Sequence, residues 1–247
     1  MKEYSAATYG DRIANVYDEF YRPANVSKRV DVLEEFAAGG RALELGIGTG
    51  TYALPLAARG VAVHGIEASH AMVARLRDKE GGAALPVTSG DFADVAVAGS
   101  FSLVFVINNT FLMLSSQEDQ VRCFASVASH LDESGVFLVH AFVPDISRYD
   151  ENQHLRASLP DVDSVRLDVS IHDAVNQIVD FRHLHLTEDG IRMYPGRLRY
   201  VWPSELDLMA RLAGLRLRER WGDWQRAPFT AQSGAHVSVY GRASSQD

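Results

Sequence analysis

The sequence predicts an α/β fold, a doubly wound sheet of mainly parallel strands that an antiparallel β insertion interrupts. Two observations predict the sheet: short apolar segments alternate with amphipathic helical segments, and a glycine-rich turn follows the first apolar segment. A third observation predicts the insertion. Apolar and polar residues alternate strictly over 164–172, which is typical of a strand with two different faces.

Composition limits the class of protein. The 247 residues, 47% of them hydrophobic, fit a single domain spanning 1–247 with a full core. The net charge of −8 argues against a nucleic-acid partner, because no basic stripe is available to neutralise phosphates. Cys123 is the only cysteine, so an intrachain disulfide is excluded. No run reaches the roughly 18 apolar residues of a membrane span, and we expect a cytoplasmic protein without a membrane partner.

The first 40 residues read as helical. Tyr9, Ile13 and Tyr17 fall on one face of an amphipathic helix. A second helix is predicted over 26–38, and the pair Gly39–Gly40 ends it before the first strand.

The glycine-rich turn comes directly after the first predicted strand, Ala42–Leu45. Gly46, Gly48 and Gly50 allow positive φ and the close approach of a ligand to the backbone. We expect a helix to begin at about Thr49 and to aim free N–H groups at a carboxylate or phosphate. A second buried strand over 61–66 ends at Glu67, about 20 residues after the turn, where an acid can bind two ribose hydroxyls. The glycine turn and Glu67 together predict a cofactor that contains a nucleoside.

Glu44 separates the alternatives for this turn. It stands two residues before the first glycine, where a carboxylate would repel the pyrophosphate of NAD but could pair with a cationic amino group. The spacing G-x-G-x-G also departs from the G-x-G-x-x-G of dinucleotide enzymes. A structural glycine cluster with a solvated Glu67 is the alternative without a ligand.

Three motifs carry a resemblance to a known family. Residues 44–50 resemble motif I of the class I S-adenosylmethionine-dependent methyltransferases, residues 67–72 resemble motif II, and Gly90-Asp91-Phe92 resembles motif III. The resemblance runs from about Tyr9 to Arg242 and is nearest to small-molecule enzymes of the glycine and sugar N-methyltransferase kind. It implies a Rossmann-like sheet of seven strands, the last of them, over 236–241, antiparallel.

The resemblance also implies a cofactor, S-adenosyl-L-methionine, with S-adenosyl-L-homocysteine as product, and a small-molecule acceptor. The residues it places at the cofactor are Tyr9, Tyr17, Glu44, Gly46, Gly48, Gly50, Glu67, Ala68, Met72, Asp91, Phe92 and Asn108. For Tyr9, Tyr17 and Met72, plain core packing is an equal alternative. A second function from another class is a regulatory protein that binds S-adenosylmethionine or S-adenosylhomocysteine without catalysis.

The strand predicted over 101–107 is nearly all apolar, as in the centre of a parallel sheet, and Asn108 with Asn109 follows at its carboxyl end. These amides either face the ligand crevice or satisfy the turn backbone. In the next strand, 136–144, His140 is either a general base at the ligand end or a core histidine bonded to a neighbouring carbonyl. The resembled subfamily commonly has glutamate there.

After the fifth strand the composition changes, and 146–201 is predicted to be an insertion that caps the active site. We expect loops or short helices over 147–163 and a meander of three strands over 164–172, 177–186 and 191–201. His172, His183 and His185 are expected on solvated strand faces rather than around a metal. We predict no metal site.

The predicted chemistry is simple, because the methyl of a sulfonium is already electrophilic and the protein mainly positions a nucleophile in line. An amine acceptor needs only to be neutral, whereas a hydroxyl benefits from a base such as His140. An amino sugar or a natural-product scaffold fits the small acidic chain. Residues 1–40 are expected to close over the cofactor as a lid, and the protein to be a monomer or homodimer.

Overall fold

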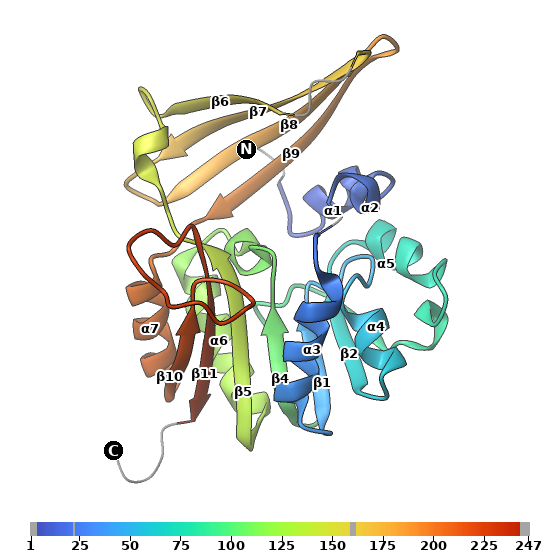
Figure 1. The fold of residues 1–247 in the computed structure, drawn as a ribbon, viewed down its shortest axis with the longest axis vertical. Coiled ribbons are helices and arrows are strands. Elements are labelled where there is room, and N and C mark those ends of the chain that lie inside the picture. Colours follow the sequence, from blue (N-terminus) through green and yellow to red (C-terminus); the bar gives the residue numbers. More distant parts are fainter. Residues whose placement is uncertain (1–3, 22, 159–161, 243–247) are drawn as a thin grey trace.

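A computed structural model describes residues 4–21, 23–158 and 162–242, and its central element is a seven-stranded sheet (Figure 1). The strands are β1 (Arg41–Leu45), β2 (Ala62–Glu67), β3 (Val87–Ser89), β4 (Phe101–Val106), β5 (Leu131–Phe142), β10 (Leu215–Trp221) and β11 (Ala235–Arg242). Their order is β10-β11-β5-β4-β1-β2-β3, and β11 runs antiparallel to both of its neighbours. The predicted fold class is confirmed, including the antiparallel last strand.

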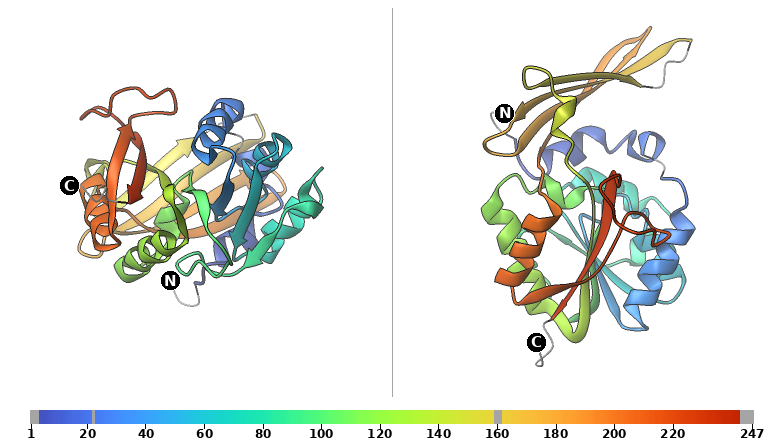
Figure 2. Two further views of the ribbon diagram at one scale, coloured as in Figure 1. Left: turned by 90° about the horizontal axis from the view of Figure 1, so that it is seen from below. Right: turned by 60° about the vertical axis from the view of Figure 1, so that its left-hand side comes forward.

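Helices cover both faces of this sheet (Figure 2). One face carries α6 (Gln117–His130) and α7 (Pro203–Leu212), and the other carries α3 (Val26–Ala37) and α4 (Ala53–Ala58). Helix α5 (His70–Arg77) follows β2, and short 3₁₀ turns lie at Gly82–Ala84, Thr110–Met113 and Ile146–Arg148. Alternate residues of each central strand pack on opposite layers, which is why these strands read as continuous apolar runs.

A second sheet follows β5 and lies over the carboxyl ends of the parallel strands (Figure 1). Its four antiparallel strands are β6 (Gln153–Ser158), β7 (Ser164–Asp173), β8 (Ile178–Thr187) and β9 (Gly190–Arg199), in chain order. The three predicted strands are confirmed. The prediction of loops or short helices over 147–163 was wrong in part, because β6 pairs with β7 along its whole length.

The faces of the second sheet are arranged differently from what the binary pattern suggests. Ser170 and His172 point toward the body of the protein and are buried, whereas Ile171 between them is 62% exposed. Register places Leu155, Ile191 and Met193 on the same outer face as Ile171, and all three are exposed. The apolar frame of β7 therefore faces away from the body. The prediction of a solvated His172 was wrong.

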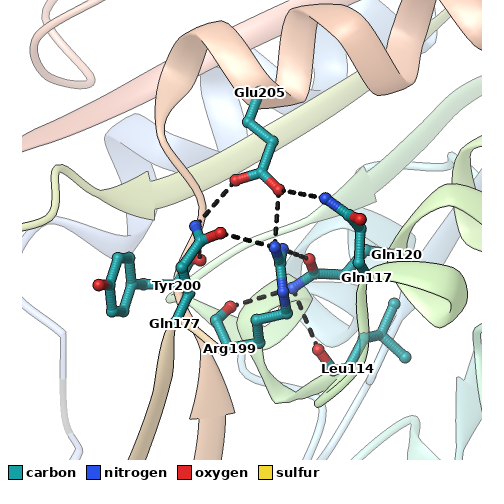
Figure 3. Close-up of polar contacts among 7 residues, drawn as sticks. All are labelled: Leu114, Gln117, Gln120, Gln177, Arg199, Tyr200 and Glu205. Atoms are coloured by element: carbon teal, nitrogen blue, oxygen red, sulfur yellow. Dashed lines mark hydrogen bonds and ion pairs between the residues drawn. The ribbon is translucent and has the colours of Figure 1, made fainter. Parts of the chain in front are cut away.

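A buried polar network joins the second sheet to the helices beneath it (Figure 3). Arg199, at the end of β9, is 5% exposed and donates to Glu205 of α7 at 2.7 Å and to Gln120 of α6 at 2.6 Å. Gln177, in the turn before β8, accepts from Arg199 at 2.8 Å and donates to Glu205 at 2.9 Å. The arginine is held by charge-assisted hydrogen bonds from three elements, so the base of the second sheet is fixed to the core.

The N-terminal helices α1 (Thr8–Ile13) and α2 (Tyr17–Phe20) lie between the two sheets (Figure 1). Ile13 is fully buried and packs in one cluster with Met72 of α5 and Tyr194 of β9. The predicted helical segment therefore bridges the second sheet and the α/β body. Within the described residues, no helix is long and apolar enough to cross a membrane.

Candidate active site

The glycine turn after β1 is held by the next strand. Gly46 and Ile47 donate their N–H groups to the carbonyl of Ile66 at 2.9 and 3.0 Å. Gly46, Gly48 and Gly50 all have positive φ, of 70°, 55° and 80°. A Cβ at Gly48 would have only the carbonyl oxygen of Gly46, at 3.9 Å, within contact range, so this side of the turn is open to a ligand.

The helix after the turn begins later than predicted. It starts at Ala53 rather than at Thr49, because the positive φ of Gly50 cannot continue a right-handed helix. The prediction that a helix begins at about Thr49 and points its free N–H groups at the ligand is therefore wrong for residues 49–52.

Glu67, at the end of β2, holds the turn and the start of α5 together. Its Oε2 accepts from the Gly48 N–H at 2.8 Å, and its Oε1 accepts from the Ser69 N–H at 2.9 Å. Burial raises the pKa of Glu67 above its ordinary value, against the lowering effect of these N–H donors. Each carboxylate oxygen can accept a further hydrogen bond, so the acid is positioned and still has acceptor capacity.

Glu44 is a buried acid without enough partners. It is 3% exposed, and its Oε2 is buried with no hydrogen-bond partner among the described residues. Burial raises its pKa well above the ordinary value. A buried carboxyl in this state is costly unless a cation or donor from a ligand compensates it.

The end of β4 brings the predicted asparagine into a polar cluster. Asn108 has φ 56°, accepts from Arg29 at 2.7 Å through its Oδ1, and donates to the Tyr52 hydroxyl at 3.0 Å through its Nδ2. Asn108 therefore lies in a turn and also at the crevice, so the two alternatives stated for it do not exclude each other. Arg29 and Tyr52 were not among the residues predicted for the site.

His140, on β5, lies beside Asn108. Its Nδ1 accepts a hydrogen bond from the backbone N–H of Asn108 at 3.0 Å. Because Nδ1 is the acceptor, the proton of the neutral ring is on Nε2. Burial, with the charge of Arg29 nearby, lowers the pKa of His140 to about 3. A neutral ring with a protonated Nε2 is a hydrogen-bond donor, and this arrangement argues against the predicted general base.

The N-terminal helices are tied over the turn by polar contacts. Asp18 of α2 accepts from the Thr49 hydroxyl at 2.5 Å and pairs with Lys79 at 2.6 Å. Asp11 of α1 accepts from the Ser69 hydroxyl at 2.6 Å. These bonds place Tyr9 and Tyr17 over the crevice, and burial raises the pKa of both phenols.

A cavity of about 670 Å³ lies between the glycine turn, the N-terminal helices and the second sheet. The predicted residues that line it are Tyr9, Tyr17, Gly46, Gly48, Glu67, Ala68, Met72, Asp91, Phe92, Asn108 and His140. Glu44 and Gly50 do not line it: Glu44 lies beneath the turn, and Gly50 packs against Leu54 and Leu76. Asp91 is exposed and accepts from the Ala93 N–H at 2.9 Å.

The far wall of the cavity comes from the second sheet and was not predicted residue by residue. Asp168 and Ser170 of β7 line it together with Phe181 and His183 of β8. The Phe181 ring lies edge-on to Tyr9, with centroids 6.0 Å apart. Asp168 and His183 lie directly opposite each other. A turn at 173–176 would instead place Phe181 opposite Asp168, so the predicted hairpin does not give this pair. No group of three or more metal-ligating side chains occurs among the described residues.

Comparisons with known proteins show which proteins this chain resembles. A model of the methyltransferase domain matches residues 42–135. The structure of the CcbJ methyltransferase from Streptomyces caelestis is 38% identical, has a TM-score of 0.92, and the match covers 98% of this chain and 100% of that chain.

Two further relatives are more distant. A cypemycin N-terminal methyltransferase from a Streptomyces species is 26% identical over 199 residues, which are 79% of this chain and 80% of that protein. The structure of CalS10, an amino pentose methyltransferase from Micromonospora echinaspora, has a TM-score of 0.69 at 21% identity, and the match covers 92% and 97% of the two chains.

Proposed function

Because this chain belongs to the class I S-adenosylmethionine-dependent methyltransferases, we propose that it methylates an amine nitrogen of a small molecule, such as an amino sugar or a natural-product scaffold. The observation that carries the proposal is the composition of one cavity. The glycine turn and Glu67 form one side, and the carboxylate of Asp168 with His183 faces them from the second sheet. An anionic group on the acceptor side favours a cationic acceptor over a neutral hydroxyl compound.

The chain's residues fit S-adenosylmethionine, which supplies an electrophilic methyl group. We propose that Glu67 binds the ribose hydroxyls and that Asp91 binds the adenine amino group, with Phe92 and Met72 against the ring. The open space at Gly48 suits the amino-acid portion of the cofactor. The unpartnered oxygen of Glu44 supports a role in compensating the cationic amino group.

The remaining residues position the acceptor and exclude water. We propose that residues 1–40 act as a lid through Tyr9 and Tyr17, and that residues 146–201 cap the acceptor side within a single domain, 1–247. His140 then orients the acceptor as a donor through Nε2. Attack in line needs no further covalent chemistry from the protein, and correct placement supplies most of the rate.

We also propose a class of partner, an oligomeric state and a cellular compartment for this chain. A net charge of −8 supports a small-molecule acceptor rather than a nucleic acid, because phosphates would be repelled. We propose a monomer or homodimer that works in the cytoplasm.

A paired assay tests the choice of nucleophile. The enzyme is given S-adenosylmethionine with an amino sugar or with the matched sugar that has a hydroxyl in place of the amine, and methylated product is measured by mass spectrometry. We expect methylation of the amine and little of its hydroxyl counterpart. Methylation of hydroxyl acceptors alone would show that the proposed nucleophile is wrong while the methyltransferase activity stands.

A further inference from the structure

Two side chains of the second sheet form a hydrogen-bonded pair in the acceptor half of the cavity. Asp168 of β7 and His183 of β8 are directly opposite in register, and both line the cavity. Oδ1 of Asp168 lies 2.5 Å from Nδ1 of His183. The side chains are 38% and 27% exposed, so the pair meets both the cavity and solvent.

This contact fixes the state of the imidazole. A carboxylate can only accept, so Nδ1 of His183 carries the proton and donates it to Asp168. When the ring is neutral, Nε2 has a free lone pair, and among the described residues it has no hydrogen-bond partner. The hydrogen bond from His183 lowers the pKa of Asp168, so the carboxylate stays ionised near neutral pH. His140, in the same cavity, has the opposite tautomer.

Other elements surround the pair with few competing acids. Tyr21, directly after α2, lies with its ring centroid 6.1 Å from that of His183, and Tyr194 of β9 is opposite His183 in register. The arginines that act on Asp168 are Arg156 and Arg148, and Arg166 acts on Tyr21. Within the part of the chain that the structure describes, no arginine lies at ion-pair distance from Asp168, and its partner is the imidazole.

An amine acceptor needs such a group. A simple alkylamine has a pKa near 10 and an amine beside electron-withdrawing groups has one of about 8, so at neutral pH most of the acceptor arrives as an ammonium ion without a lone pair. A cation is also disfavoured beside a sulfonium unless an anion is close. A carboxylate that attracts the cation and a group that takes one proton would therefore both assist the reaction at neutral pH.

We propose that Asp168 and His183 bind the ammonium form of the acceptor and deprotonate it. This inference rests on the proposed function. His183 is the catalytic residue: its Nε2 lone pair takes one N–H proton and leaves the electron pair on nitrogen. That pair attacks the methyl carbon, and the carbon–sulfur bond breaks with its electrons going to sulfur, which becomes a neutral thioether. The methylated amine keeps the positive charge, and the imidazolium returns its proton to water. Asp168 is a positioning residue that sets the tautomer and attracts the cation.

The test uses His183→Asn and Asp168→Asn in the full chain. Asparagine at 183 retains a donor toward Asp168 but has no group in place of Nε2. With an amine acceptor that the wild type methylates, kcat/KM at neutral pH should fall at least roughly tenfold in His183→Asn, a loss discounted from the general-base range. The deficit should shrink as pH rises, because the acceptor then loses its proton in solvent. Asp168→Asn should raise the acceptor KM as well.

Controls separate catalysis from folding. His185→Gln changes a histidine of the same strand that lies against Phe20 at 5.3 Å, and it should keep wild-type rates. His140→Gln should retain the wild-type pH profile even if its rate falls. The affinity of His183→Asn for S-adenosylhomocysteine should equal that of wild type. If His183→Asn misfolds, His183→Gln replaces it with the same expectation.

A second measurement does not depend on turnover. Calorimetric binding of the amine to the complex with S-adenosylhomocysteine, in two buffers of different ionisation enthalpy, should report release of a proton to the buffer, because the imidazolium passes on the proton that it took from the ammonium, and His183→Asn should abolish this release. A wild-type pH profile in His183→Asn, with amine methylation intact, would overturn the role of the pair alone. A wild type that methylates only hydroxyl acceptors would overturn the proposed nucleophile and this inference together.

Discussion

Glu67 is a single residue on which the cofactor half of the cavity depends. Its carboxylate accepts N–H groups from Gly48 and Ser69, so it positions the turn and keeps acceptor capacity for a ligand. Glu67→Ala should therefore weaken binding of S-adenosylhomocysteine by about 1–3 kcal/mol, measured by calorimetry. Glu80→Ala, an exposed acid after α5, is the matched control. Unchanged affinity in a folded Glu67→Ala protein would remove this residue from the site.

Gly48 offers a test of the open space above the turn. Its φ of 55° disfavours a branched side chain, and valine would fill the region where no atom but the Gly46 carbonyl comes near. Gly48→Val should abolish binding of S-adenosylhomocysteine and leave the far-UV circular dichroism spectrum intact. Normal binding by this variant would mean that the glycine has a structural role only.

Gly196 has a different role, on the acceptor side. A Cβ there would lie 2.0 Å from the ring of Phe181, which rests across this glycine and faces Tyr9. Gly196→Ala should push the ring into the cavity and raise the acceptor KM without changing affinity for S-adenosylhomocysteine. The control is Gly234→Ala, where a Cβ meets nothing within 4 Å. An unchanged acceptor KM in Gly196→Ala would show that the ring has room to move.

At the scale of elements, the Arg199 network decides how the second sheet is attached. Burial works to raise the pKa of Glu205, but hydrogen bonds from Gln177 and Arg199 bring it below its ordinary value. Glu205→Ala leaves a buried guanidinium without its carboxylate, and a loss of about 3–5 kcal/mol in unfolding free energy is expected. Chemical denaturation measures it, with the exposed Glu188→Ala as control.

The pH dependence of this network has a defined sign. The folded pKa of Glu205 is lowered, so its contribution is fully present above the ordinary glutamate value of about 4.3 and is lost as pH falls through the lowered folded value. The difference in unfolding free energy between wild type and Glu205→Ala should therefore shrink in acid. A constant difference down to that range would contradict the charge pairing.

Elements differ in how well the sequence predicts them. The seven-stranded sheet and the turn follow from local patterns, because buried parallel strands are apolar throughout and glycine is needed at positive φ. Strand β6 was missed, since its residues alternate weakly and its pairing partner follows later in the chain.

The acceptor wall was missed for another physical reason. On β7, the alternating apolar residues Val165, Leu167 and Ile171 look like the buried face of a strand. The opposite, polar face of β7 lines the cavity. The cavity side therefore carries Asp168 and Ser170, and the binary pattern points to the wrong side. For His140 the sequence indicated the place, but its bond to the Asn108 N–H depends on the neighbouring strand end.

At the scale of the whole molecule, two coverings lie over the cavity, the N-terminal helices and the second sheet. They differ in how strongly they are bound to the α/β body. The N-terminal helices are tied by pairs such as Asp18 with Lys79, whose side chains are 45% and 32% exposed, and such pairs contribute only about 0–1 kcal/mol. The base of the second sheet is instead held by the buried Arg199 network. We therefore expect the covering over the glycine turn to open more readily.

Hydrogen exchange tests this difference. Addition of S-adenosylhomocysteine should slow exchange of the amides in residues 8–20, because a ligand beneath the N-terminal helices stabilises their closed position. Amides of β8 and β9 should change little. Equal protection of both regions would mean that the second sheet also moves when the ligand binds.

The exposed outer face of the second sheet has a consequence for crowded solutions. Leu155, Ile171, Ile191 and Met193 are each at least 55% exposed, on the side opposite the cavity. Contiguous apolar surface of this kind favours self-association as concentration rises. Any molecule that covers this face approaches from behind the acceptor wall. Self-association through this face therefore brings no second copy against the cavity-lining side of the sheet, and we expect turnover per copy to stay constant as concentration rises.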